Sequence, residues 1–349
     1  LTVSIPMIDI RTIGAGGGSI AWLDNGGFLQ VGPQSAGADP GPSCYSLGGV
    51  QPTVTDANIV LNRLIPEFFL NGSMELSRER AVESLSTVST SEKESIEDLA
   101  ISITQISEDN MANAIRMISV VEGYDPREFS LISFGGAGPL HATAIARKLS
   151  IPRVVIPVVP GNISALGFLL ADSRIDKIRT FPMRSDALNV DRINEQFRSA
   201  EDAAATELRA DRYTGSIVWM NTIKMRYAGQ NHEYDVPIRH RQVTSKLLEQ
   251  AFDSFHQRHE ILYGYRRPEA IIEIISLSTT ALGRISKPPT EFLQPKRTQS
   301  TKRIQSVYFP EIGYQNTPII ERQSLSIGEK ISGPAVLVES GSTVLLRPG

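Results

Sequence analysis

The sequence has 349 residues, of which 41% are hydrophobic and 21% are charged, so it can bury a large core and is expected to form at least two domains. Its formal net charge is −3 with no long block of like charges, which argues against a nucleic acid or an anionic membrane as partner and favours a small metabolite. The single cysteine, Cys44, excludes a disulfide framework within the chain and a thiolate zinc cluster, and it suits the reducing cytoplasm.

Residues 1–10 are apolar and strand-like and do not begin with methionine, so we expect the natural chain to extend further at this end. The next segment, Arg11–Ile20, places four glycines within five positions. Glycine runs cost conformational entropy, so this one predicts backbone that passes close to a ligand or another surface; a flexible linker is the alternative. Asn25–Gly27, between two short apolar runs, predicts a β-hairpin.

Glycine and proline punctuate Gly32–Gly49 throughout, which predicts a long ordered loop rather than a regular element. Its one acidic residue, Asp39, could hold a metal, orient a water molecule or cap a turn, and its Asp-Pro-Gly context favours the turn. Thr55 or Asp56 is then the predicted N-cap of a helix, which makes Asp56 a cap rather than a catalyst.

The strongest helical pattern spans Ser91–Val121, where apolar residues recur with a period of 3.6. A buried strand is predicted at Glu128–Phe134, and a helix over Leu140–Leu149 that Pro139 opens. A second β-branched strand from Arg153 completes a β-α-β unit, which implies a parallel pair of strands.

A glycine loop joins the first of these strands to its helix and contains Gly135, Gly136 and Gly138. Glycines there let a ligand approach bare backbone where the helix N-terminus presents free N–H groups, which favours a phosphate or a nucleoside. Glycines that serve only the geometry of the turn are the alternative. His141, two residues beyond Pro139, is a polar candidate that could reach a bound ligand, although a buried, hydrogen-bonded histidine is an equal alternative.

The most apolar stretch, Val154–Leu170, is broken by prolines and a glycine well short of a spanning helix, so no membrane segment is predicted. A helix capped by Ser164 is predicted in its second half. The later elements expected from periodicity are surface helices in Ser185–Arg212, a hairpin of Val218–Tyr227 with Tyr234–Ile238, a helix at Leu247–Tyr263, a strand at Ile271–Leu282, a linker at Ser286–Arg303 and short terminal strands. His256 and His259 lie three residues apart with no further ligand nearby, which favours packing over metal binding. The chain stops directly after a strand, so we expect it to continue at this end also.

Several long motifs occur in a fixed order along the chain. They are TIGAGGGSIAW, VGPQSAGADPGPSCY, TVTDANIVLNRL, SFGGAGPLHA, SALGFLLAD, RYAGQNHEY and HEILYGY. With these motifs the chain resembles the hydantoinase A and 5-oxoprolinase family over nearly its whole length. The two Asp-x-Gly-Gly-Thr type phosphate loops of that family do not occur here, so the chain resembles the back part of an A-type subunit.

The resemblance implies an α/β fold: an incomplete actin-like ATPase (ribonuclease H-like) lobe over residues 1–181, followed by a smaller α+β C-terminal domain over 182–349. It implies ATP and Mg²⁺ as cofactors. The residues expected to contact the nucleotide are Gly135, Gly136 and Gly138 at its adenosine end and Gly16, Gly17, Gly18 and Ser19 across the cleft. Asp39 and His141 are the candidate catalytic residues, and no metal ligands are predicted.

The resemblance also implies ATP-dependent opening of a cyclic amide such as hydantoin or 5-oxoproline, in which the amide oxygen is phosphorylated before water attacks. A B-type subunit is the implied partner. Two alternatives remain: a subunit of an acetone- or acetophenone-type carboxylase, which shares this kind of chain, or a non-catalytic fragment that binds nucleotide weakly or docks a B-type partner. Without the phosphate loops, the 349 residues alone are not expected to hydrolyse ATP at an enzymic rate.

Overall fold

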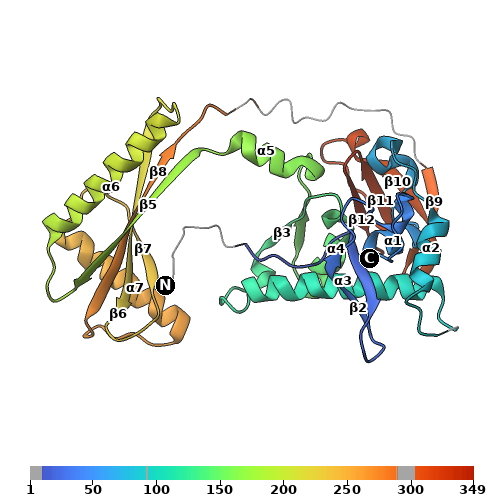
Figure 1. Ribbon diagram of the computed structural model, residues 1–349, viewed down its shortest axis with the longest axis horizontal. Helices are drawn as coiled ribbons and strands as arrows, with labels where there is room; N and C mark the ends of the chain where they lie inside the picture. Colours follow the sequence, from blue (N-terminus) through green and yellow to red (C-terminus); the bar gives the residue numbers. More distant parts are fainter. Residues whose placement is uncertain (1–9, 92, 288, 290–302) are drawn as a thin grey trace. The chain divides into compact units, whose positions relative to one another are not determined.

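The computed structural model describes residues 10–91, 93–287, 289 and 303–349, which form two compact units (Figure 1). Of the described residues, the larger unit contains 10–91, 93–166, 289 and 303–349, and the smaller unit contains 167–287. The two predicted domains, 1–181 and 182–349, are continuous segments of the sequence, and this division stays a prediction. In space the C-terminal strands belong with the larger unit.

The larger unit has three sheets. A hairpin pairs β1 (Ser19–Leu23) with β2 (Leu29–Ser35), and a parallel pair joins β3 (Ser130–Ile132) to β4 (Arg153–Val155). The third sheet has the order β12-β11-β10-β9. Its strands are β9 (Arg303–Phe309), β10 (Gly313–Glu321), β11 (Ala335–Glu339) and β12 (Ser342–Leu346).

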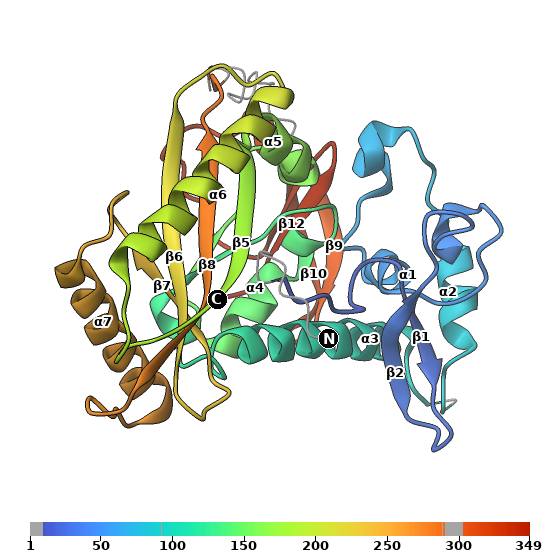
Figure 2. The same cartoon turned by 60° about the vertical axis from the view of Figure 1, so that its left-hand side comes forward.

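Besides its sheets, the larger unit contains helices and short 3₁₀ turns (Figure 2). The helices are α1 (Val54–Val60), α2 (Arg78–Ser86), α3 (Ile96–Ile118), α4 (Gly138–Leu149) and α5 (Ile163–Leu170). The last residues of α5 belong to the smaller unit. The 3₁₀ turns are η1 (Ser43–Tyr45), η2 (Pro66–Gly72), η3 (Pro126–Glu128), η4 (Pro160–Asn162) and η6 (Arg322–Ser324). One core packs the apolar faces of α1, α2 and α3 against inward residues of β9–β12 such as Phe309 and Val336. Helix α4 and the β3–β4 pair share a smaller core with the C-terminal half of α3.

The smaller unit is an antiparallel sheet with two helices packed on its apolar face. Its strand order is β5-β8-β6-β7, with β5 (Ser173–Arg184), β6 (Ile217–Tyr227), β7 (Tyr234–Ile238) and β8 (Ile272–Gly283); the helices are α6 (Val190–Ala210) and α7 (Ser245–Tyr263). Alternate residues of β6, namely Ile223, Met225 and Tyr227, are fully buried and contact the same core as Phe197 of α6 and Phe255 of α7. This period-2 burial is what an antiparallel sheet with one covered face requires.

The strongly patterned elements agree with the sequence predictions: the β1–β2 and β6–β7 hairpins, the parallel β3–β4 pair, and helices α3, α4 and α7. Pro139 lies in the first turn of α4, as predicted. The strand predicted at Glu128–Phe134 is only three residues long, because η3 ends at Glu128, and the prediction that it is buried was wrong: Ser130 and Ile132 are exposed. Among the described residues, no helix combines the length and apolar character that a membrane span requires.

Three further predictions were wrong. The N-cap of α1 is Thr53, and Asp56 is instead its partner in a capping box. Ser164 lies inside α5 rather than capping it. The loop predicted from Gly32 begins later, because β2 extends to Ser35, and it contains the turn η1. Strand β5 was not predicted at all, and most of the predicted linker Ser286–Arg303 lies outside the described residues.

Candidate functional site

The larger unit contains a cavity of about 210 Å³ that both predicted glycine segments line. Gly17 and Gly18 contribute backbone from the segment before β1, and Gly136 contributes backbone from the loop before α4. His141, on the first turn of α4, also lines this cavity. Two stretches that lie more than 100 residues apart in the sequence therefore meet at one cavity.

The rest of the cavity wall divides by chemistry. Apolar and aromatic side chains form one part: Tyr45, Leu64, Phe68, Phe69, Leu70 and Leu140. Hydroxyl, amide and carboxyl groups contribute the others: Thr55, Asn58, Ser340, Ser342, Thr343 and Glu339. An apolar wall with a few polar groups is typical of a small-molecule site, and flat aromatic rings suit a planar heterocycle.

The first glycine segment is held against the start of α1. The backbone N–H of Thr55 and its hydroxyl both donate to the carbonyl of Gly17, each at 2.9 Å. A Cβ on Gly17 would lie 2.8 Å from the Thr55 hydroxyl, so only glycine fits there. Ser19 closes the loop, because its hydroxyl accepts from Gly16 N–H at 2.9 Å and donates to the Gly14 carbonyl at 3.2 Å. These contacts fix the backbone on this side of the cavity.

The second glycine segment has a different constraint at each position. Gly135 adopts φ +86°, a left-handed conformation that favours glycine, and its carbonyl accepts from the Ser342 hydroxyl at 3.2 Å. A Cβ on Gly138 would lie 3.1 Å from the Ser133 hydroxyl. At Gly136, by contrast, the nearest protein atom would be 3.6 Å from a Cβ, an ordinary contact. The fold therefore tolerates a side chain at Gly136, although such a side chain would occupy the cavity.

Asp56 fixes the backbone at Cys44, next to the cavity-lining Tyr45. Its buried carboxylate accepts from the backbone N–H of Cys44 at 2.7 Å, from the backbone N–H of Thr53 at 2.9 Å and from the Thr53 hydroxyl at 2.7 Å. Burial raises the pKa of the Cys44 thiol, and together with the nearby Cys44 and Asp56 it raises the pKa of Tyr45 to about 12. Both groups stay protonated at neutral pH, so neither is an activated nucleophile.

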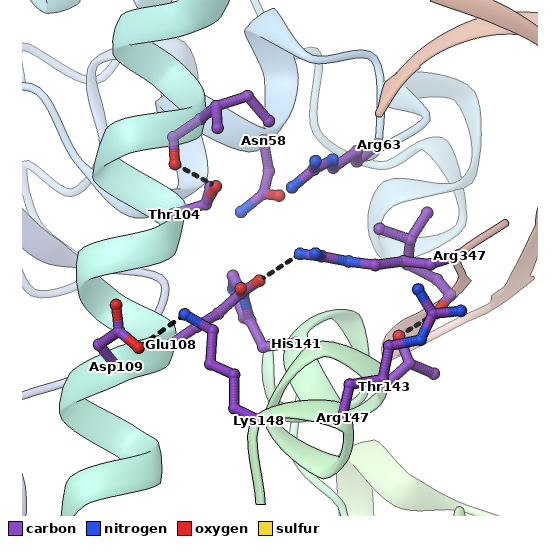
Figure 3. Close-up of polar contacts among 12 residues, drawn as sticks. Asn58, Arg63, Thr104, Glu108, Asp109, His141, Thr143, Arg147, Lys148 and Arg347 are labelled. Atoms are coloured by element: carbon purple, nitrogen blue, oxygen red, sulfur yellow. Dashed lines mark hydrogen bonds and ion pairs between the residues drawn. The ribbon is translucent and has the colours of Figure 1, made fainter. Parts of the chain in front are cut away.

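A cluster of buried charged residues lies beside the cavity (Figure 3). Glu108 of α3 accepts from the Arg347 guanidinium at 2.8 Å, and the Nδ1 atom of His141 lies 3.3 Å from the same carboxylate oxygen. Glu108 and His141 are each about 1% exposed. Burial acts to raise the pKa of Glu108, but the hydrogen bond to His141 and the charge of Arg347 outweigh it and hold that pKa below its usual value.

Arg63 is a second cation of this cluster, more deeply buried than Arg347, whose side chain is 8% exposed. Its Nε donates to the Tyr308 carbonyl at 3.2 Å, and Arg63 itself is 1% exposed. Burial, followed by the charge of Arg347, lowers the pKa of Arg63 to about 10, so the side chain remains positive at neutral pH. Two buried arginines thus accompany one buried carboxylate.

The predicted site residues occupy several positions relative to the cavity. Gly17, Gly18, Gly136 and His141 line it, whereas Gly16, Ser19, Gly135 and Gly138 belong to the same two loops without lining it. Asp39 is exposed and is not among the lining residues. The catalytic and nucleotide-binding roles assigned to these residues stay predictions.

Asn58, Glu108 and Arg347 were missed by the sequence analysis. Asn58 lies in the motif TVTDANIVLNRL, so its place in that motif was the one available signal. Within the described residues, no group of three or more His, Cys, Asp or Glu side chains could hold a metal. The one carboxylate on the cavity wall, Glu339, is bonded to Arg322 at 2.7 Å, and burial raises its pKa.

Two family models match the chain, one for hydantoinase/oxoprolinase over residues 1–177 and one for the hydantoinase/oxoprolinase C-terminal domain over residues 182–349. The chain belongs to the hydantoinase/oxoprolinase family. The resemblance inferred from the sequence motifs is therefore confirmed.

Three relatives illustrate the range of the family. The caprolactamase subunit alpha of Pseudomonas jessenii is 36% identical over 99% of this chain and 51% of its own length. The 5-oxoprolinase 1 of Arabidopsis thaliana is 31% identical over 99% of this chain and 28% of its length, and the acetophenone carboxylase gamma subunit of Aromatoleum aromaticum is 30% identical over 99% and 49%. The chain thus spans about half of two of these relatives and less than a third of the other.

The crystal structure of the ATP-dependent caprolactamase from Pseudomonas jessenii superimposes on this chain with a TM-score of 0.83 at 35% identity. The match covers 99% of this chain and 52% of that one. This confirms a mixed α/β fold of the caprolactamase type.

Proposed function

We propose that the cavity of the larger unit binds ATP and that the chain is part of an enzyme that uses ATP to open a cyclic amide. The observation that carries the proposal is the meeting of two glycine segments, an aromatic wall and His141 at one cavity. Family membership supports it, since relatives include an ATP-dependent caprolactamase and 5-oxoprolinases. The fold we propose for this unit is an incomplete actin-like ATPase lobe of the ribonuclease H-like type.

Within this proposal each part of the cavity has a role. The Gly135–Gly138 loop borders the nucleoside, with Tyr45 and Phe69 beside the base, and the Gly16–Ser19 segment lies across from it. Bound ATP would supply the phosphoryl group that activates the amide oxygen toward water. Fixed backbone N–H groups act as preorganised donors, which cost no reorganisation during the reaction. Mg²⁺ would be held mainly by the phosphates, because the described residues offer no carboxylate cage.

The proposed substrate is hydantoin or 5-oxoproline, and the caprolactamase relative adds caprolactam as a third cyclic amide to test. We further propose a B-type subunit as partner, since two relatives are themselves named as subunits. The reducing cytoplasm is the proposed location, because the chain has one cysteine and that cysteine is buried.

The first test is ATP binding by the natural full-length protein, measured by calorimetry. Gly136→Val should weaken ATP binding by at least tenfold and leave the folded state intact, because Gly136 lines the cavity and a Cβ there would meet no protein atom closer than 3.6 Å. Gly167→Val is the matched control, since that position is exposed and has open space around it. Equal ATP affinity in wild type and folded Gly136→Val would rule out this cavity as the nucleotide site.

The second test separates the cyclic amide from the alternative substrate. A ketone carboxylase is the second candidate function, because the acetophenone carboxylase subunit is 30% identical over 99% of this chain. Phosphate release by the full-length protein with its B-type partner and magnesium should rise with a cyclic amide and not with a ketone plus bicarbonate. The opposite response would replace the amide proposal with the carboxylase one.

A further inference from the structure

Buried polar atoms without partners gather beside the cavity. Of the seven such side-chain atoms among the described residues, five belong to one cluster: Asn58 Oδ1, Arg63 Nη2, Glu108 Oε2, His141 Nε2 and Arg347 Nε. Figure 3 shows these side chains projecting from separate elements toward the same space. Because nearly every buried polar atom in a folded protein finds a partner, this concentration needs an explanation beyond stability.

The hydrogen-bond network determines the state of the His141 ring. Glu108 is ionised, so its carboxylate can only accept, and Nδ1 of His141 must carry the hydrogen that points toward it. The charges of Arg63 and Arg347 are matched by Glu108 and by the partly exposed Glu311, whose carboxylate lies 3.7 Å from Arg347. Nε2 faces no carboxylate or other acceptor of the described residues within hydrogen-bonding distance, so no partner holds a second hydrogen there. In the neutral ring with a hydrogen on Nδ1, Nε2 is a hydrogen-bond acceptor.

Asn58 presents the same kind of atom. Its Nδ2 donates to the Val54 carbonyl at 2.9 Å, which leaves Oδ1 as an acceptor without a partner. Both Asn58 and His141 line the cavity. Two unpartnered acceptors suit a ligand group that donates hydrogen bonds, such as a hydroxyl or an amino group, and they do not suit a phosphate oxygen.

We propose that Nε2 of His141 accepts a hydrogen bond from the nucleoside part of the bound nucleotide, and that Glu108 is the positioning residue that holds the ring in its accepting tautomer. The donor is a ribose hydroxyl or the exocyclic amine of adenine, which share this chemistry. This inference rests on the proposed function, because it needs a nucleotide in the cavity. It gives the buried pair a role in ligand selection as well as in packing.

The experiment compares ATP with analogues that each lack one donor: 2′-deoxyATP, 3′-deoxyATP and the triphosphate of purine riboside. Affinities are measured by calorimetry on the full-length protein. One analogue should bind roughly 2- to 10-fold more weakly than ATP to the wild type, the factor that one hydrogen bond contributes. His141→Asn keeps an N–H for Glu108 but has no atom in place of Nε2, so that difference should disappear. His141→Gln offers an amide oxygen there and should restore part of it.

Glu108→Gln tests the positioning role, because its amide can donate to Nδ1 and so allow the tautomer in which Nε2 carries the hydrogen. The preference for ATP over the selected analogue should fall in this variant even though His141 is intact. Asp109→Asn is the matched control: it makes the same chemical change one residue along α3, where Asp109 is exposed and paired with Lys148 at 2.6 Å. Asp109→Asn should keep the wild-type preference.

The outcomes distinguish the proposed ATP binding from the proposed role of His141. A wild type that does not bind ATP would overturn the proposed function itself. A wild type that binds ATP, with His141→Asn showing the same ratios among analogues, would overturn this inference alone. If His141→Asn lost affinity equally for every nucleotide, His141 would have a structural role. If its loss of affinity depended on how many phosphates the nucleotide carries, His141 would contact the phosphates. Either result contradicts the proposal. If Glu108→Gln does not fold, the two His141 variants decide.

Discussion

His141 of the larger unit and His259 of the smaller unit are both completely buried, yet their surroundings differ. The Nδ1 of His259 donates to the Tyr265 carbonyl at 2.8 Å, its Nε2 lies 3.3 Å from the Gln230 side-chain oxygen, and aromatic rings pack around it. His141 bonds through one nitrogen to a charged residue, and its other nitrogen has no partner. Burial alone does not distinguish a packing histidine from a binding one, whereas unsatisfied bonding capacity beside a cavity does.

The largest expected effect is on the stability of the charged cluster. Glu108→Ala should lower the free energy of unfolding of the larger unit by about 3–5 kcal/mol, because it removes the buried partner of Arg347 and leaves that arginine only the partly exposed Glu311 at 3.7 Å. Denaturant unfolding measures this loss, with Asp109→Ala as a control that should cost less than about 1 kcal/mol as an exposed pair. A Glu108→Ala protein as stable as the control would mean that the cluster is not a structural unit.

His259→Ala tests whether the buried histidine of the smaller unit serves only in packing. It should destabilise the smaller unit by roughly 2–4 kcal/mol, since it opens a cavity among packed rings and breaks two hydrogen bonds. Hydrogen exchange of β6 and α7 would report this loss. Nucleotide affinity should be unchanged, whereas His141→Asn should alter nucleotide selection with a smaller cost in stability. If His259→Ala changed the ratio of ATP to analogue binding, the division of roles would be wrong.

Tyr227→Phe tests a single hydroxyl near His259. That hydroxyl accepts from the backbone N–H of Arg267 at 2.9 Å and lies 2.6 Å from Nδ1 of His256, to which it donates. Removing it should destabilise the smaller unit by about 1–2 kcal/mol, because two partly buried groups lose their partner while ring packing is kept. Thermal unfolding measures the change, and a variant as stable as the wild type would show that water replaces the hydroxyl without cost.

The smallest effect is a pH dependence from His256. Burial lowers the pKa of His256 below its usual value of 6.5, and its Nδ1 accepts from Tyr227, so the folded state favours the neutral ring. Between the folded pKa and 6.5 the unfolded chain binds more protons than the folded one, so stability rises with pH across this window and is lost as pH falls. His256→Gln should show a shallower slope there. Parallel pH curves for the two proteins would contradict this origin.

Much of the fold could be predicted where periodicity is strong. The apolar repeat of α3 and the alternation in β6 identify their structure without tertiary information. Strand β5 could not be found in this way, because charged residues punctuate its sequence SRIDKIRTFPMR and its partner β8 lies about 100 residues later. Its structure comes from pairing rather than from local preference.

The site was predictable only in its backbone. Glycine clusters indicated both loops, and the position of His141 after one of them made it a candidate. Glu108 stands in the polar sequence Ser-Glu-Asp-Asn, which favours an exposed helix face. It is buried because α4 and the segment after β12 pack over α3, and Arg347, some 240 residues away, supplies its charge partner. No local pattern carries that information.

The most direct test of the account is a crystal structure of the full-length protein with a non-hydrolysable ATP analogue. We predict nucleotide density in the cavity lined by Gly17, Gly136 and His141, with a nucleoside hydroxyl or amine within hydrogen-bonding distance of His141 Nε2. A nucleotide bound elsewhere, with this cavity empty and the Glu108–His141 pair unchanged, would contradict it.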